Sequence, residues 1–150
     1  MKSENPLRHF AIPLGIAVLV YVIFYAGIEH RRTRKGAWEV TFTNDASGVP
    51  TLIINQTNLN ITNLQSTFPS MTNRAEGASL DLSKPQPVPY DIPFGKCVFM
   101  DTTFLPGTIV FDLFGHEIQL IPRVLTIDKK EIPWESGKII AVSGTNGVKP

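Results

Sequence analysis

The residues that come closest to a reactive constellation are Asp112, His116 and Glu117, which fall within a six-residue segment. A histidine and two carboxylates could bind a metal ion or exchange a proton if their side chains converged on one point. However, His116 and Glu117 are adjacent on a predicted strand, so their side chains should point to opposite faces. The pattern therefore predicts a hairpin with polar residues, and not a metal or catalytic site.

The remaining candidates for catalysis are weaker. Asp101 and Asp112 could form a carboxylate pair, but nothing in the sequence places them the roughly 5–10 Å apart that glycoside hydrolysis requires. Cys97 is the only cysteine and lies in an apolar run, where a thiol usually packs as a small hydrophobe. No phosphate-binding glycine loop, dinucleotide fingerprint or nucleophile elbow occurs. The sequence thus predicts a protein that is not an enzyme and that binds no metal or cofactor.

Trp38 and Trp134 are the candidate contact residues of the chain. Trp38 follows a basic cluster, and Trp134 follows a proline beside a predicted hairpin tip. Exposed tryptophans could contact a partner protein or stack on sugar rings, whereas buried tryptophans would fill a core or an interface. Packing in a core or interface is the favoured interpretation of both residues.

The feature around which these residues must be arranged is an uncharged stretch from Phe10 to Ile28. Its 19 residues would form a helix about 28 Å long, close to the thickness of the hydrocarbon core of a bilayer. The stretch is longer than the apolar region of a signal peptide and has no polar face. We therefore predict a retained transmembrane helix, with Pro13 in its first turn and with Tyr21 and Tyr25 at the interface.

A basic cluster follows this stretch and is expected to contact lipid head groups: Arg31, Arg32, Arg34 and Lys35. Lys2 and Arg8 precede the stretch at a lower density. Because basic residues favour the cytoplasmic side, the cluster favours a cytoplasmic location for the domain that follows. The alternative is a periplasmic or other extracytoplasmic location, since short N-terminal tails commonly remain inside.

The charge is divided unevenly along the chain. Residues 1–35 contain six basic and two acidic residues, whereas residues 36–150 contain eight basic and eleven acidic residues. Nucleic-acid binding depends mainly on neutralising phosphates with basic side chains. The mildly acidic second part therefore argues against a nucleic-acid partner.

From Gly36 onward, hydrophobic residues recur with a period of two and no window shows a clean helical period. Short apolar runs are separated by Gly, Pro and Asn at intervals of roughly 8–12 residues, which is typical of antiparallel sandwiches and barrels. Eight or nine strands are expected. Residues 69–95 are rich in proline and predict a long surface connection that could include one edge strand, either as a crossover between two sheets or as a functional loop.

The predicted fold is therefore all-β: a single N-terminal transmembrane helix followed by one antiparallel β-sandwich or barrel-like domain. The expected segments are an N-terminal tail at 1–9, the transmembrane helix at 10–28, a basic juxtamembrane linker at 29–36, the β domain at 37–145 and a C-terminal tail at 146–150.

Two functions fit this organisation. The first is a non-catalytic accessory or structural subunit, whose helix packs within an integral membrane protein complex and whose β domain docks on partner proteins. The second is a membrane-anchored module that binds carbohydrate or envelope material on the outer side. The second predicts exposed, roughly coplanar tryptophans, so the burial of Trp38 and Trp134 distinguishes the two.

Overall fold

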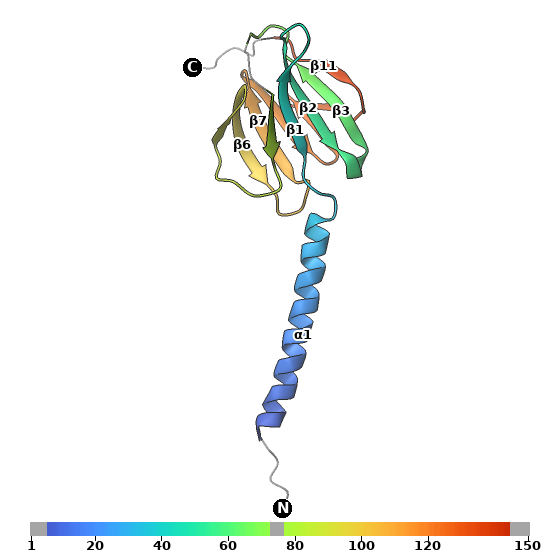
Figure 1. Cartoon of the computed structure of the whole chain (residues 1–150), viewed down its shortest axis with the longest axis vertical. Helices are drawn as coiled ribbons and strands as arrows, with labels where there is room; N and C mark the ends of the chain where they lie inside the picture. The colour runs from blue at the N-terminus through green and yellow to red at the C-terminus, as the bar shows by residue number, and fades with distance from the viewer. Residues whose placement is uncertain (1–5, 73–76, 145–150) are drawn as a thin grey trace, which may run out of the picture. The chain divides into compact units, whose positions relative to one another are not determined.

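The computed structural model describes residues 6–72 and 77–144, which form two compact units divided between Arg34 and Lys35 (Figure 1). The first unit is one helix and the second is built of strands. The predicted C-terminal tail at 146–150 and residues 1–5 of the predicted N-terminal tail lie outside the described residues.

Helix α1 spans Pro6–Thr33 and contains 28 residues, which gives it a length of about 42 Å. It extends beyond the predicted 10–28 stretch at both ends. At its C-terminal end the predicted linker is helical as far as Thr33, where Arg32 pairs with Glu29 one turn earlier. The expected place of Pro13 in the first turn is wrong, because Pro6 begins the helix and Pro13 lies inside it.

Two sheets form the second unit. The five-stranded sheet has the order β11-β3-β2-β1-β4, with β1 at Glu39–Asn44, β2 at Pro50–Gln56, β3 at Ile61–Thr67, β4 at Ala78–Asp81 and β11 at Ile139–Ala141. The six-stranded sheet has the order β10-β9-β8-β7-β6-β5, with β5 at Tyr90–Ile92, β6 at Gly95–Asp101, β7 at Thr108–Leu113, β8 at His116–Ile121, β9 at Val124–Ile127 and β10 at Lys130–Ile132. A short 3₁₀ turn, η1 at Thr57–Leu59, joins β2 to β3.

The predicted fold class is confirmed: one N-terminal apolar helix precedes a β-sandwich. The described residues form eleven strands, more than the eight or nine expected, because the proline-rich connection contributes two short edge strands, β4 and β5. These lie in different sheets, so the connection is a crossover between the sheets. One pairing departs from the antiparallel expectation, since β11 runs parallel to β3.

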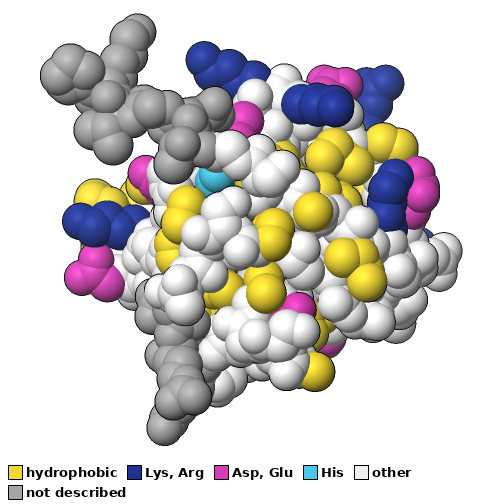
Figure 2. All heavy atoms as spheres, turned by 90° about the horizontal axis from the view of Figure 1, so that it is seen from above, with side chains coloured by type: hydrophobic (Ala, Val, Ile, Leu, Met, Phe, Trp, Pro, Cys, Tyr) yellow, Lys and Arg dark blue, Asp and Glu magenta, His cyan; other side chains and the backbone are white. Residues whose placement is uncertain are grey.

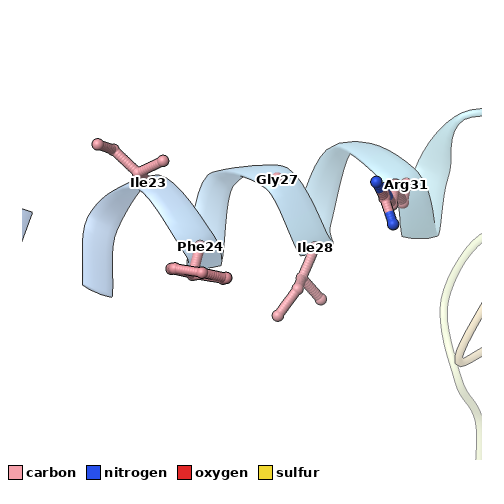
Figure 3. Close-up of a pocket in the computed structure, with 5 residues that line it drawn as sticks. All are labelled: Ile23, Phe24, Gly27, Ile28 and Arg31. Atoms are coloured by element: carbon pink, nitrogen blue, oxygen red, sulfur yellow. The ribbon is translucent and has the colours of Figure 1, made fainter. Parts of the chain in front are cut away.

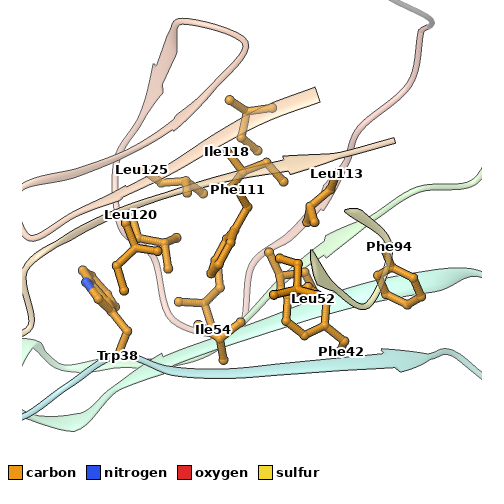
Figure 4. Packing of buried hydrophobic residues seen from close by; sticks show 14 of the residues in the cluster. Trp38, Phe42, Leu52, Ile54, Phe94, Phe111, Leu113, Ile118, Leu120 and Leu125 are labelled. Carbon is orange, nitrogen blue, oxygen red and sulfur yellow. The ribbon is translucent and has the colours of Figure 1, made fainter. Parts of the chain in front are cut away.

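The core lies between the two sheets and is filled by inward-facing side chains of both (Figure 4). Phe42 of β1 meets Phe111 of β7 edge to face, with ring centroids 6.0 Å apart. Aromatic pairs favour this arrangement because the positive edge of one ring meets the negative face of the other. Alternating burial along β8 shows why the period-two pattern predicted strands here.

Gly107 ends the connection from β6 to β7, and two features require a glycine there. Its φ of +76° lies in the left-handed region, and a Cβ atom would overlap the backbone carbonyl oxygen of Asp101. Its own carbonyl oxygen accepts a hydrogen bond from Trp38 Nε1 at 3.0 Å, across 69 positions of sequence. The conformation of this loop therefore positions the carbonyl group that holds Trp38, one residue before β1.

We expect Gly107→Ala to lower the free energy of unfolding of the β domain by about 3 kcal/mol or more, because strain and a backbone overlap combine. Chemical unfolding of the full chain in mild detergent, followed by tryptophan fluorescence, measures this loss. Gly137→Ala is the matched control: Gly137 also has a positive φ, +70°, but a Cβ atom there meets nothing within 4 Å. Equal losses in the two variants would contradict the proposed overlap.

Candidate functional site

The outer surface of α1 is apolar over most of its length. From Phe10 to Ile28 every side chain is exposed, and among the described residues α1 is the one helix long and apolar enough to span a membrane. Tyr21 and Tyr25 stack on one face, with ring centroids 6.2 Å apart. This placement on one face agrees with their spacing of four residues.

The basic cluster begins in the last turn of α1, where its two helical arginines differ. The Arg32 guanidinium donates two hydrogen bonds to the carboxylate of Glu29, at 3.0 and 2.7 Å. Arg31 makes no hydrogen bond or ion pair with the described residues. The side chains of Arg34 and Lys35, which follow the helix, are exposed.

A shallow groove of about 230 Å³ lies on α1 beside Arg31 (Figure 3). Its lining residues are Ile23, Phe24, Gly27, Ile28 and Arg31. The space above Gly27 is open, because a Cβ atom at that position would meet nothing within 4 Å. The groove thus combines four uncharged lining residues with one basic side chain, Arg31.

The two tryptophans pack against each other, with ring centroids 5.1 Å apart and planes tilted by 32°. Trp38 is only 1% exposed, so it offers no surface to a partner, which counts against the contact predicted there. Trp134 is half-buried, and its Nε1 donates to the carbonyl of Ile121 at 3.0 Å. Core packing, the favoured interpretation, describes Trp38.

A side-chain clamp that the sequence analysis missed holds the residues before Trp38. The buried amide Nε2 of Gln56 lies within 2.8–3.1 Å of three successive carbonyl oxygens, those of residues 35, 36 and 37. Asn58 Nδ2 adds a hydrogen bond of 2.7 Å to the carbonyl of Lys35. The Gln56 Oε1 accepts the backbone N–H of Asn58 at 3.0 Å, which orients the amide. The β domain therefore holds its own chain in place from Lys35 onward.

The sheet separates His116 from the other two residues of the predicted polar hairpin, Asp112 and Glu117, which lie directly opposite each other in the register of β7 and β8. His116 is buried, whereas Asp112 and Glu117 lie on the outer face, as the alternation predicts. The partner of His116 is Asp128, whose Oδ2 lies 2.7 Å from His116 Nδ1 and whose Oδ1 accepts the backbone N–H of Glu117. This pair joins the start of β8 to the turn after β9. Asp128 was not predicted, because its proximity follows from strand register.

The other candidates for catalysis are also separated or buried. Asp101 lies opposite Thr108 on β7, so Asp112 is four residues further along that strand, or about 13 Å away. Cys97 is fully buried, and burial raises the pKa of its thiol, which makes the reactive thiolate scarce. Among the described residues, no three His, Cys, Asp or Glu side chains are grouped to hold a metal ion.

The exposed surface of the β domain carries charges of both signs. In the face shown in Figure 2, basic and acidic side chains lie mostly at the periphery and hydrophobic side chains are scattered between them. Three of the five exposed large hydrophobic residues described in the β domain lie in β6 and the loop after it, where Val98 is 40%, Phe99 48% and Phe104 59% exposed; the other two, Val88 and Ile139, lie apart from them in the sequence. A register shift between Cys97 and Phe99 marks a β-bulge at this point.

Comparison with known proteins adds no assignment: no family model, no curated protein and no solved structure matches the chain.

We expect Gln56→Glu to lower the free energy of unfolding by about 3 kcal/mol, because a carboxylate cannot donate to the three carbonyl oxygens and would leave them facing an acceptor. Chemical unfolding of the full chain gives the stability, and hydrogen exchange of residues 35–38 reports the clamp itself. Gln86→Glu makes the same chemical change at an exposed position. The role of the clamp is refuted if both variants lose equal stability and the exchange at 35–38 is unaltered.

Proposed function

We propose that this protein is a non-catalytic accessory subunit of an integral membrane protein complex, anchored by α1 and docking on its partners through the β domain. The observation that carries the proposal is the uninterrupted apolar surface of α1, which is exposed from Phe10 to Ile28. Moving one large apolar side chain out of water contributes roughly 1.5–3 kcal/mol, so a surface of this length favours a bilayer strongly.

The docking surface that we assign to the β domain is the exposed apolar segment of residues 98–104. The bulge at Cys97 places Val98 and Phe99 on the surface in succession, and Phe104 follows in the next loop. Aromatic side chains are enriched in protein interfaces. Phe99 and Phe104 belong neither to the described hydrophobic core nor to the residues packed against it, so contact with a partner accounts for their exposure. This segment replaces Trp38, which is buried.

The alternative function, binding of carbohydrate or envelope material, has less support. This function predicted two exposed, roughly coplanar tryptophans, and the two tryptophans instead pack on each other, tilted by 32° and with Trp38 buried. The separation of Asp101 from Asp112 and the burial of Cys97 support a non-catalytic role.

We place the β domain on the cytoplasmic side, because four basic residues follow the apolar stretch within five positions. Thiol labelling can test this location, because the only native cysteine, Cys97, is buried and should not react in the folded chain. Ala46→Cys adds an exposed thiol in the turn between β1 and β2. In intact cells a membrane-impermeant maleimide should leave this variant unlabelled. After lysis the same reagent should label one thiol per chain.

Labelling of the Ala46→Cys variant before lysis would instead place the domain outside. The native chain is the control: it should remain unlabelled before and after lysis, and labelling on lysis would show that Cys97 is accessible.

A photo-crosslinking amino acid at Phe99 tests the docking surface in native membranes. We expect it to cross-link to a discrete membrane protein, because an exposed aromatic residue at an interface lies within contact distance of the partner. The same group at Ala46, in a turn of the other sheet, is the matched control and should give no such product. Phe99→Ser should reduce co-purification of that protein at least tenfold, with stability changed by less than about 1 kcal/mol.

The absence of a cross-link at Phe99 and at Phe104, together with elution of the native chain alone in mild detergent, would refute the subunit proposal. A product at Ala46 but not at Phe99 would move the docking surface to the other sheet.

A further inference from the structure

The groove on α1 has the helical spacing of a continuous surface. Ile23, Gly27 and Arg31 follow one another at intervals of four residues, so they lie along one face. Phe24 and Ile28 form the adjacent row of the same face. Along the helix Gly27 is about 6 Å from Arg31, and Ile23 is about 12 Å from it. The apolar part of the groove therefore begins one turn before the basic side chain.

Arg31 differs from its neighbour in having no anionic partner among the described residues. Glu29 lies three positions before Arg32 and binds its guanidinium through two hydrogen bonds. Arg31 is only two positions from Glu29, a spacing that directs two side chains to different sides of a helix. A guanidinium at the edge of an apolar surface binds phosphate well, because its planar donors match two phosphate oxygens.

We propose that this groove binds one anionic phospholipid, with the phosphate on the Arg31 guanidinium and an acyl chain over Gly27, beside the row formed by Phe24 and Ile28. The inference rests on the proposed membrane anchor. Both parts of the lipid would meet a complementary surface. Arg31 lies where the apolar stretch ends and faces the phosphate, and the open space at Gly27 lies within the apolar stretch and faces the acyl chain. A side chain at position 27 would occupy the space assigned to the acyl chain.

The test uses the full chain reconstituted in bilayer discs of phosphatidylcholine with a minor fraction of phosphatidylglycerol. Native mass spectrometry after release from the discs should show one phosphatidylglycerol retained per chain, with about tenfold preference over phosphatidylcholine. Arg31→Gln should reduce this preference to about one. Arg32→Gln is the matched control, since it removes the same charge one position away but from an arginine already paired with Glu29.

Gly27→Leu tests the acyl-chain part of the groove and should reduce retention at least fivefold while leaving both arginines in place. Inorganic phosphate at millimolar concentration should not displace the lipid, because a free anion does not fill the open space at Gly27. Displacement by phosphate would overturn the acyl-chain contact. Equal losses in the Arg31→Gln and Arg32→Gln variants would overturn the site, because general attraction to the surface would then account for the binding.

Three further outcomes separate this inference from the proposed function. Failure of the native chain to float with vesicles of phosphatidylcholine alone would refute the anchor and the lipid site together. Normal flotation without preference for phosphatidylglycerol would refute only the lipid site. If Arg31→Gln abolishes co-purification of a partner protein but leaves lipid retention unchanged, the anion is a carboxylate of that partner and the lipid proposal is wrong.

Discussion

The constraint on which the molecule depends is the removal of the α1 surface from water. No polar face interrupts the exposed side chains from Phe10 to Ile28, so no orientation of this helix in water is favourable. Its backbone groups are satisfied within the helix, which is the condition for entering hydrocarbon. The apolar surface ends near the C-terminal end of the helix, where Glu29 and Arg32 form an ion pair. The apolar side chains and the internally hydrogen-bonded backbone of this helix are therefore both compatible with hydrocarbon, whereas its side chains are unfavourable in water.

The β domain is ordered from its first residues, which follow the helix directly in the sequence. Two internal contacts achieve this: Gln56 holds the carbonyl groups of residues 35–37, and Trp38 reaches the carbonyl of Gly107. Both donors are buried, so their hydrogen bonds are formed where unpaired carbonyl groups would be costly. The chain that precedes β1 is consequently part of the folded domain. With α1 ending at Thr33, the covalent connection between helix and domain is very short.

Period-two alternation was sufficient to predict most strands and an antiparallel sandwich or barrel, because strands such as β7 and β8 bury one face and expose the other. His116 and Glu117 illustrate this, since alternation alone places them on opposite faces. The same reasoning could not find Asp128 as the partner of His116, because that contact depends on the register of β8 against β9. Nor could it find the parallel pairing of β11, because a three-residue strand carries no signal for direction. The Gln56 clamp was missed for the same reason: a polar residue at the end of a strand indicates a turn, and its partners lie about twenty residues earlier.

The basic cluster shows that residues of one type and one neighbourhood can have different roles. Arg31 and Arg32 are equivalent in charge, and they count equally toward the preference of basic residues for the cytoplasmic side. Counted by contacts they are not equivalent, because helical geometry brings Glu29 to Arg32 and away from Arg31. An ion pair within the helix screens Arg32 from other anions, whereas Arg31 remains available beside the open space at Gly27. The difference is encoded in the three-residue spacing of Glu29 and Arg32, so the available basic residue can be identified from the sequence once the helix is known to continue to Thr33.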